Sequence, residues 1–234
     1  IMADDAAEVE EITAICGGLN INIGTLNKNT IPSMFLAGKK ANALGHIVLL
    51  DPVGAGASRL RTDTANRLMQ EVRFDAVRGN ISEIKTLCTG SGSTKGVDAD
   101  AVDAVTEANL DDGVQLVKAF AQKTGCIVAV TGAIDLVSDG ERCWCIRNGR
   151  AEMSRITGTG CQLSALMTAF LVANPDRKLD AAAAAVCMMG LAGEIGWANM
   201  QPGDGNSTYR NRIIDAIFNM TGDALEEGAK YELR

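Results

Sequence analysis

The sequence predicts an α/β fold, an open and mostly parallel β-sheet with helices on both faces. Short apolar runs alternate with longer stretches of helical periodicity, which is the pattern of consecutive parallel β-α-β units. Hydrophobic residues make up 47% of the chain but aromatic residues only 4%, and this aliphatic mixture suits helices packed on a sheet. Turns rich in Gly, Asp, Asn and Thr follow the expected strands, where ligands of such folds bind.

Short apolar runs bounded by turn-forming residues have the length of strands. In chain order they cover residues 19–23, 46–50, 74–77, 126–130, 135–138 and 142–146. The last two flank Asp139-Gly140, a dipeptide that favours a tight turn between antiparallel strands. The sequence therefore predicts a β-hairpin near residues 135–147 beside the parallel strands.

Helical periodicity and end signals predict helices between these strands. Thr30 is suited to cap the second helix, with Pro32 in its first turn and Gly45 at its end. The stretch 180–198 is apolar all round, which predicts a deeply buried helix. The expected helices cover residues 6–15, 30–45, 103–123, 162–172, 180–198 and 211–220, and two further helices begin near Thr62 and Ser82. The helix over 162–172 starts at Gly160 or Cys161, and a charged tail follows residue 220.

Composition and charge limit the classes of protein to consider. The net charge is −7 and the basic residues are dispersed, so binding to nucleic acid or to anionic membranes is not expected. No apolar run reaches the roughly 20 residues that span a bilayer. The seven cysteines lie mostly in apolar runs, which indicates reduced thiols and a cytoplasmic location. Residues 89–100 are polar and glycine-rich, as in a mobile surface loop, so we expect one domain over 1–234.

The segment Gly158-Thr159-Gly160-Cys161 lies directly before an expected helix. Free N–H groups at a helix start bind phosphate, the helix dipole adds to this, and glycines let the backbone approach a ligand. A plain tight turn would have the same sequence, so both interpretations stay open here. A thiol at the start of a helix favours the thiolate, whereas a small buried hydrophobe is the alternative for Cys161.

Other polar residues follow the expected strands. Asn80 and Glu83 lie three residues apart, a spacing that suits a hydrated Mg²⁺ but equally forms an ordinary capping box. Asp51 could hold a metal-bound water or cap the following turn. Arg78 could pair with a phosphate, and Thr131 could contact a nucleotide or only shape its turn.

Taken together, these motifs resemble those of the hydroxyethylthiazole kinase family in the ribokinase-like superfamily. The matching segments keep their order and spacing along nearly the whole chain. They are residues 1–4, 22–26, 51–57, 78–84, 96–98, 130–132 and 156–161. The resemblance implies transfer of the ATP γ-phosphate to the hydroxyethyl group of 4-methyl-5-(2-hydroxyethyl)thiazole, a salvage step toward thiamine.

The resemblance also implies roles for residues around the nucleotide and the metal ion. Arg78 and Thr131 would contact ATP as the co-substrate. Asn80 and Glu83, with Asp51 at the neighbouring strand end, would organise Mg²⁺.

On the acceptor side, the resemblance implies that Met2 and Gly158 contact the thiazole. Residues 158–161, including Gly158 and Gly160, would form the anion hole for the transferred phosphoryl group. Cys161 stands where many ribokinase-like enzymes carry an aspartate base, so a thiol there could accept the hydroxyl proton, or else the alcohol needs little activation. The family forms homotrimers with active sites between subunits, and its N-terminal segment, which helps to build the thiazole pocket, would precede residue 1.

Two alternatives remain open at this point. One is another ribokinase-like kinase, acting on hydroxymethylpyrimidine or pyridoxal, although the Gly-Thr-Gly-Cys segment argues against it. The other is a catalytically idle protein that sequesters thiazole or nucleotide. Turnover of ATP with each acceptor distinguishes them.

Overall fold

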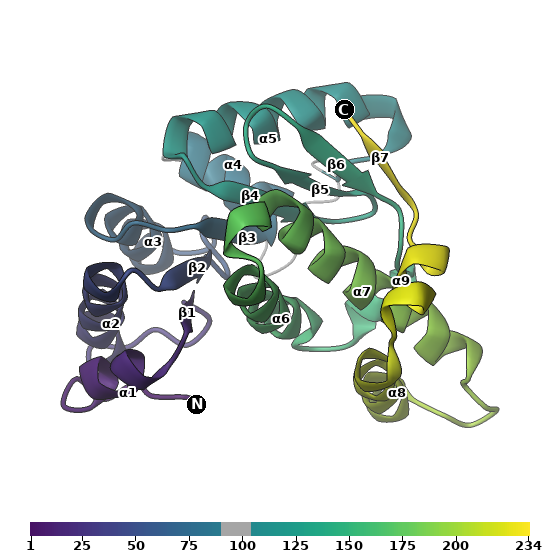
Figure 1. Cartoon of the computed structure of the whole chain (residues 1–234), viewed down its shortest axis with the longest axis horizontal. Coiled ribbons are helices and arrows are strands. Elements are labelled where there is room, and N and C mark those ends of the chain that lie inside the picture. The colour runs from purple at the N-terminus through teal and green to yellow at the C-terminus, as the bar shows by residue number, and fades with distance from the viewer. Residues whose placement is uncertain (90–103) are drawn as a thin grey trace.

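A computed structural model describes residues 1–89 and 104–234 of the chain. Three predictions fall wholly or partly outside the described residues. They are most of the expected loop over 89–100, the segment 96–98, and the first residue of the helix expected over 103–123. Within the described part, the strands form one sheet of seven in the order β1-β2-β3-β4-β5-β6-β7, so β1 and β7 lie at its opposite edges (Figure 1).

The sheet is mixed, with parallel strands in the first half and antiparallel strands in the second. The parallel strands are β1 (Gly18–Asn22), β2 (Ile47–Asp51), β3 (Ala76–Asn80) and β4 (Ile127–Thr131). The antiparallel strands that continue from β4 are β5 (Asp135–Ser138), β6 (Cys143–Ile146) and β7 (Tyr231–Leu233). The predicted α/β class and the predicted hairpin are confirmed.

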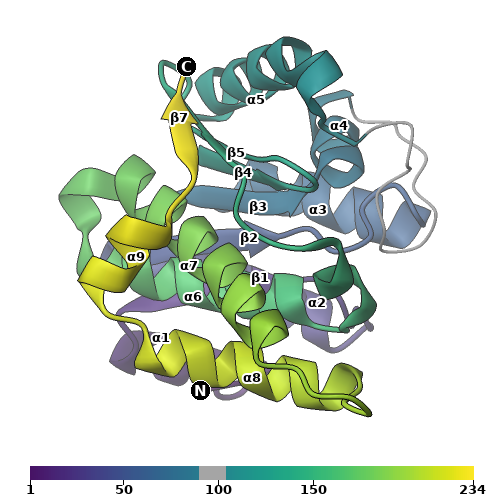
Figure 2. The ribbon, with the colours of Figure 1, turned by 90° about the vertical axis from the view of Figure 1, so that its right-hand side faces the viewer.

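Helices cover both faces of the sheet, as Figures 1 and 2 show. One face packs against α2 (Thr30–Leu44), α3 (Arg59–Glu71), α4 (Ile81–Thr89) and α5 (Leu110–Thr124). The other packs against α6 (Thr159–Ala173), α7 (Lys178–Ala198) and α8 (Asn206–Asn219). Two short helices complete the described fold, α1 (Val9–Ile15) against α2 and α9 (Gly222–Gly228) against α7.

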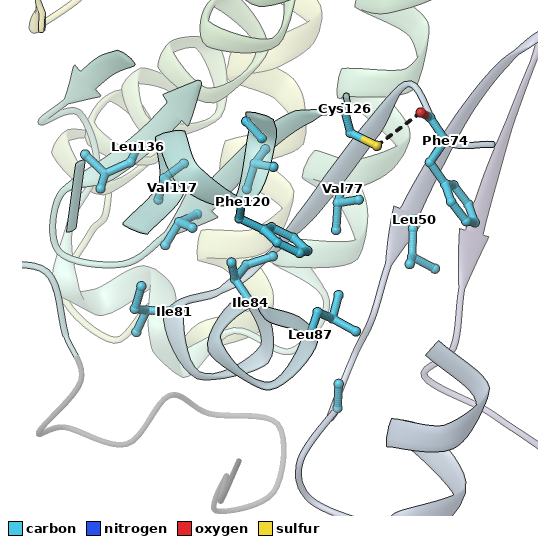
Figure 3. Close-up of a cluster of buried hydrophobic side chains, with 14 of the residues drawn as sticks. Leu50, Phe74, Val77, Ile81, Ile84, Leu87, Val117, Phe120, Cys126 and Leu136 are labelled. Atoms are coloured by element: carbon cyan, nitrogen blue, oxygen red, sulfur yellow. Dashed lines mark hydrogen bonds between the residues drawn. The ribbon is translucent and has the colours of Figure 1, made fainter. Parts of the chain in front are cut away.

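Alternation along the strands divides the core into two layers. In β2, Val48 and Leu50 belong to the cluster under α2–α5, whereas Ile47 and Leu49 belong to the cluster under α6–α8. Figure 3 shows part of the first cluster, where Ile84 of α4 lies near Phe120 of α5. This packing fixes the start of α4 at the carboxyl end of β3.

The long apolar helix is a core element. By length and composition the stretch Pro175–Ala198 could cross a membrane, but 67% of its apolar window is buried in the fold. The helix predicted over 180–198 is thus confirmed as buried, with its start at Lys178.

Several predicted boundaries are wrong, and local capping explains most of them. Helix α3 begins at Arg59 rather than near Thr62, because the Ser58 hydroxyl accepts a hydrogen bond from the Arg61 N–H at 3.3 Å. Thr30 is the first residue of α2 and not its cap, since the side-chain Oδ1 of Asn27 accepts hydrogen bonds from the N–H groups of residues 29 and 30.

The later helices differ from the prediction as well. Helix α5 begins at Leu110, because a capping box between Thr106 and Asn109 starts a short 3-10 turn just before it. Helix α8 begins at Asn206 rather than residue 211. The charged tail is also ordered, because it forms α9 and pairs β7 with β6.

Candidate active site

Polar side chains at the carboxyl ends of β1–β4 lie on the face of the sheet that α6 covers. Asn22 pairs in register with Asp51, which lies two residues after Leu49 and therefore on the same face. Arg78 pairs with Ala129 of the same core cluster, and Thr131 follows on β4 two residues later. The four strand ends thus carry an amide, a carboxylate, a guanidinium and a hydroxyl toward one helix start.

Arg78 lies at the centre of this group and is 12% exposed. Its Nη2 donates a hydrogen bond to the Thr131 Oγ1 at 2.7 Å, and its Nη1 lies 3.6 Å from the Asp51 Oδ1. The Arg78 Nε is buried and has no hydrogen-bond partner among the residues that the structure describes. The guanidinium therefore keeps donor capacity for an anion.

The start of α6 lies directly against Arg78. Gly158 precedes the helix with φ +97°, a left-handed conformation that favours glycine. A Cβ at Gly160 would lie 2.6 Å from the Arg78 Nη1 and 2.8 Å from Nη2, so this position needs glycine if Arg78 is to stay in place. The first N–H groups of a helix lack partners within it, so this start offers donors of the kind that bind anions.

Asp51 is fully buried at the end of β2. Its Oδ2 accepts hydrogen bonds from the Asn22 Nδ2 and the Ser164 Oγ, both at 2.8 Å. Its Oδ1 has no hydrogen-bond partner among the described residues. Burial raises the pKa of this carboxyl, and the charge of Arg78 and the two hydrogen bonds only partly oppose the rise. Oδ1 thus keeps acceptor capacity for a metal-bound water.

Glu83 and Asn80 form a reciprocal capping box. The Glu83 N–H donates to the Asn80 Oδ1 at 2.9 Å, and the Asn80 N–H donates to the Glu83 Oε2 at 2.8 Å. The Glu83 Oε1 accepts from the Gly54 N–H at 2.7 Å. Burial raises the pKa of Glu83 to about 7 despite these bonds. The capping interpretation is confirmed.

This donor set fits a hydrated Mg²⁺ better than a bare ion. Both carboxylate oxygens of Glu83 already accept backbone hydrogen bonds, whereas the Asp51 Oδ1 does not. In the described ranges, His, Cys, Asp and Glu side chains form no group of three or more able to enclose a metal ion. Mg²⁺ usually keeps several waters and one or two carboxylates, so these residues suit outer contacts to such an ion.

Cys161 is exposed in the first turn of α6, so its interpretation as a buried hydrophobe is wrong. Its Sγ accepts a hydrogen bond from the Asn22 Nδ2 at 3.1 Å. Met2, in contrast, is 99% exposed near the start of the chain. The site residues predicted from the sequence therefore gather at the carboxyl ends of the parallel strands. Met2 is the exception, because the rest of the chain leaves its side chain exposed.

Sequence reasoning missed several residues at this edge. Asp135 accepts a hydrogen bond from the Gly132 N–H at 2.8 Å and so shapes the turn after Thr131. Desolvation of its carboxyl raises the pKa of Asp135 to about 7. An aspartate three residues after a Thr-Gly turn was a usable signal. The roles of Asn22 and Ser164 depend on contacts across the fold and had no local signal.

Arg61 also went unnoticed, although it holds two loops at this edge. Its guanidinium donates to the carbonyl oxygens of Ile23 at 3.0 Å, Val53 at 2.6 Å and Gly24 at 2.8 Å. These carbonyls follow β1 and β2. Arg61 thus fixes the backbone directly after Asn22 and Asp51.

Comparison with known proteins identifies relatives of the whole chain. The sequence profile described as "Hydroxyethylthiazole kinase family" matches residues 1–223. A hydroxyethylthiazole kinase of Clostridium acetobutylicum is 56% identical over 232 residues, which cover 99% of this chain and 85% of the relative.

Solved structures agree with this assignment. The structure of the hydroxyethylthiazole kinase protein from Pyrococcus horikoshii OT3 has a TM-score of 0.86 and 30% identity, covering 100% of this chain and 84% of that chain. A pyridoxal kinase from Staphylococcus aureus in complex with ADP has a TM-score of 0.61 and 18% identity, covering 97% and 77%. The latter likeness concerns the fold alone.

Proposed function

The chain belongs to the hydroxyethylthiazole kinase family, and we propose that its carboxyl-edge site transfers the γ-phosphate of ATP to the hydroxyethyl group of 4-methyl-5-(2-hydroxyethyl)thiazole. The reaction is a salvage step toward thiamine. The observation that carries this proposal is the contact between the start of α6 and Arg78, which joins an anion-binding helix start to a guanidinium with free donor capacity.

Phosphoryl transfer depends mainly on positioning and on stabilising charge. Arg78 and Thr131 would hold the nucleotide, since their side chains already form one hydrogen-bonded unit. The N–H groups over residues 158–161 would stabilise the charge on the transferred group, with Gly158 and Gly160 letting it approach the backbone.

The acceptor hydroxyl oxygen would then bond to the γ-phosphorus while the bond from that phosphorus to the β–γ bridging oxygen breaks, so ADP leaves. The hydroxyl proton would go to the sulfur of Cys161, which is exposed at the helix start. The cysteine thus takes the place of the aspartate base in related kinases.

Mg²⁺ would neutralise phosphate charge in this site. Asp51 would contact a water of the ion through its Oδ1, which accepts no hydrogen bond from the described residues, while Asn80 and Glu83 would place a second carboxylate beside the ion. Burial of both carboxylates favours their neutral forms, and a nearby divalent cation favours the charged forms, so Mg²⁺ binding and ionisation support each other.

Met2 and Gly158 would contact the thiazole, and the exposure of Met2 supports a site completed by another subunit. Ile1, Met2 and Ile15 are large apolar side chains with exposed fractions of 87%, 99% and 73%. A homotrimer of single kinase domains, each spanning residues 1–234, would cover such residues. The free cysteines among the described residues support a cytoplasmic location.

A turnover assay tests this function against a kinase for another alcohol and against an idle binding protein. ADP release is measured with Mg-ATP and, separately, the thiazole alcohol, pyridoxal or hydroxymethylpyrimidine. We expect release with the thiazole and a much lower rate with the other two. Binding of the thiazole without ADP release, or a preference for pyridoxal or the pyrimidine, would contradict the proposal.

A further inference from the structure

The side-chain amide of Asn22 connects three separate parts of the fold. Its Oδ1 accepts a hydrogen bond from the Gly24 N–H at 2.8 Å. Its Nδ2 donates to the Asp51 Oδ2 at 2.8 Å and to the Cys161 Sγ at 3.1 Å. One amide on β1 therefore contacts the next strand end and the first turn of α6, far away in the sequence.

The orientation of this amide is set by its partners. A backbone N–H can only donate, so the oxygen of Asn22 must face Gly24. The NH₂ group then faces the carboxylate of Asp51 and the sulfur of Cys161, and each of its two hydrogens has an acceptor. A flipped amide would lose the bonds to Gly24 and Asp51, and these two bonds therefore set the direction of the N–H···S contact.

Asp51 and Ser164 fix the positions of Asn22 and Cys161 relative to each other. Ser164 is fully buried on α6, three residues after Cys161, and its hydroxyl donates to the same Asp51 oxygen that Asn22 contacts. The first two turns of α6 are therefore tied to the strand ends at two points, through Cys161 and through Ser164. These ties limit how far the sulfur can move relative to Asp51.

We propose that Asn22 is a positioning residue for phosphoryl transfer, which holds the Cys161 sulfur at the edge of the sheet and stabilises negative charge on it by donating a hydrogen bond. The inference rests on the proposed function, in which this sulfur accepts the hydroxyl proton. The amide N–H of Asn22 can only donate, so the sulfur is the acceptor in this contact, and the bond stabilises negative charge that develops on the sulfur.

The reactivity of Cys161 toward iodoacetamide, without ATP or thiazole, measures this effect. Peptide mass spectrometry follows alkylation of this cysteine separately from the others at one fixed pH. Because a hydrogen bond to a charged group corresponds to about a 10-fold effect, we expect Asn22→Ala to slow alkylation by roughly that factor. Asn22→Asp should slow it further, since a carboxylate repels the thiolate.

Asn20→Ala is the matched control. Asn20 lies on the same strand and the same face, and its Oδ1 has no hydrogen-bond partner among the described residues. We expect its alkylation rate and turnover to match those of the wild type. Circular dichroism and thermal unfolding check that each variant is folded. If Asn22→Asp does not fold, Asn22→Ser, whose hydroxyl can donate one bond, should give a rate between those of Asn22→Ala and the wild type.

Wild-type alkylation rates in folded Asn22→Ala would overturn the proposal, as would an equal loss in Asn20→Ala. Turnover gives a second readout, because a positioning role predicts a lower kcat with little change in the KM for ATP. Absence of thiazole phosphorylation in the wild type would refute the proposed function instead, and the substrate-free alkylation result would still report on Asn22.

Discussion

Replacement of Gly160 by alanine separates ATP binding from folding stability. The new Cβ would lie 2.6 Å from the Arg78 Nη1, 2.8 Å from Nη2 and 3.1 Å from Cζ. Carbon and nitrogen atoms do not approach so closely, so the guanidinium must move away. It is the far end of a flexible side chain, and its movement is possible without unfolding α6.

The displaced guanidinium would lose its 2.7 Å bond to Thr131 and its proposed contact with phosphate. A hydrogen bond to a charged group contributes about 1.5–3 kcal/mol, so the KM for ATP should rise by about 10- to 100-fold. Loss of the bond to Thr131 also destabilises the fold, and the preference of helices for alanine over glycine, up to about 1 kcal/mol, offsets part of that loss, so the free energy of unfolding should fall by no more than about 2 kcal/mol.

Steady-state kinetics with varied ATP, together with urea unfolding, measures both quantities. Gly222→Ala is the control, because nothing lies within 4 Å of a Cβ at that helical position. It should leave the KM for ATP unchanged. A Gly160→Ala protein with the wild-type KM for ATP would refute the placement of the nucleotide beside Arg78.

Three further changes test the surroundings of this contact. The folded-state pKa of Glu83, about 7, lies above the usual 4.5, so without divalent ions the folded protein holds the extra proton and its stability should fall as pH rises from about 4.5 to 7. The free energy of unfolding, measured with urea, should fall by at most about 3 kcal/mol over this range. Glu83→Gln should flatten this pH dependence and raise the Mg²⁺ concentration needed for turnover. If the variant leaves both the pH dependence and the Mg²⁺ titration unchanged, Glu83 has only a capping role. Cys161→Asp should keep or raise kcat and Cys161→Ala should lose part of it; a folded but inactive Cys161→Asp would rule out a base at this position. Asp135→Asn keeps an acceptor for the Gly132 N–H and should nearly preserve the KM for ATP, whereas Asp135→Ala should raise this KM by roughly 5-fold. Equal KM values for the two variants would contradict a role of the turn after Thr131 in ATP binding.

Local patterns predicted the parts of the fold that local interactions form. The hairpin over residues 135–146 follows from an Asp-Gly turn between alternating runs, and β5 (Asp135–Ser138) has the predicted bounds. Strand β7 is only three residues long and exists through pairing with β6 and the edge-to-face contact between Tyr231 and Trp144, with ring centroids 5.1 Å apart. Its sequence alone could not indicate either partner.

The same division holds for the candidate site. Gly158 and the turn that follows carry a local signature, because phosphate-binding helix starts need glycine near the ligand. Asn22 has no such signature, since its contact with Cys161 spans 139 positions of the chain. The spacing of Asn80 and Glu83 likewise fitted two roles for Glu83, and only the reciprocal bonds between the backbone N–H and the side chain of each residue revealed the capping box. Met2 is almost fully exposed, so its proposed contact with the thiazole stays a prediction.

A crystal structure of the protein with Mg²⁺, a non-hydrolysable ATP analogue and the thiazole alcohol tests the central claim most directly. The γ-phosphate should lie on the N–H groups over residues 158–161, with Arg78 bound to a phosphate oxygen and the acceptor hydroxyl beside the Cys161 sulfur. A nucleotide bound elsewhere, or a γ-phosphate that leaves Arg78 and the start of α6 without contact, would contradict the account.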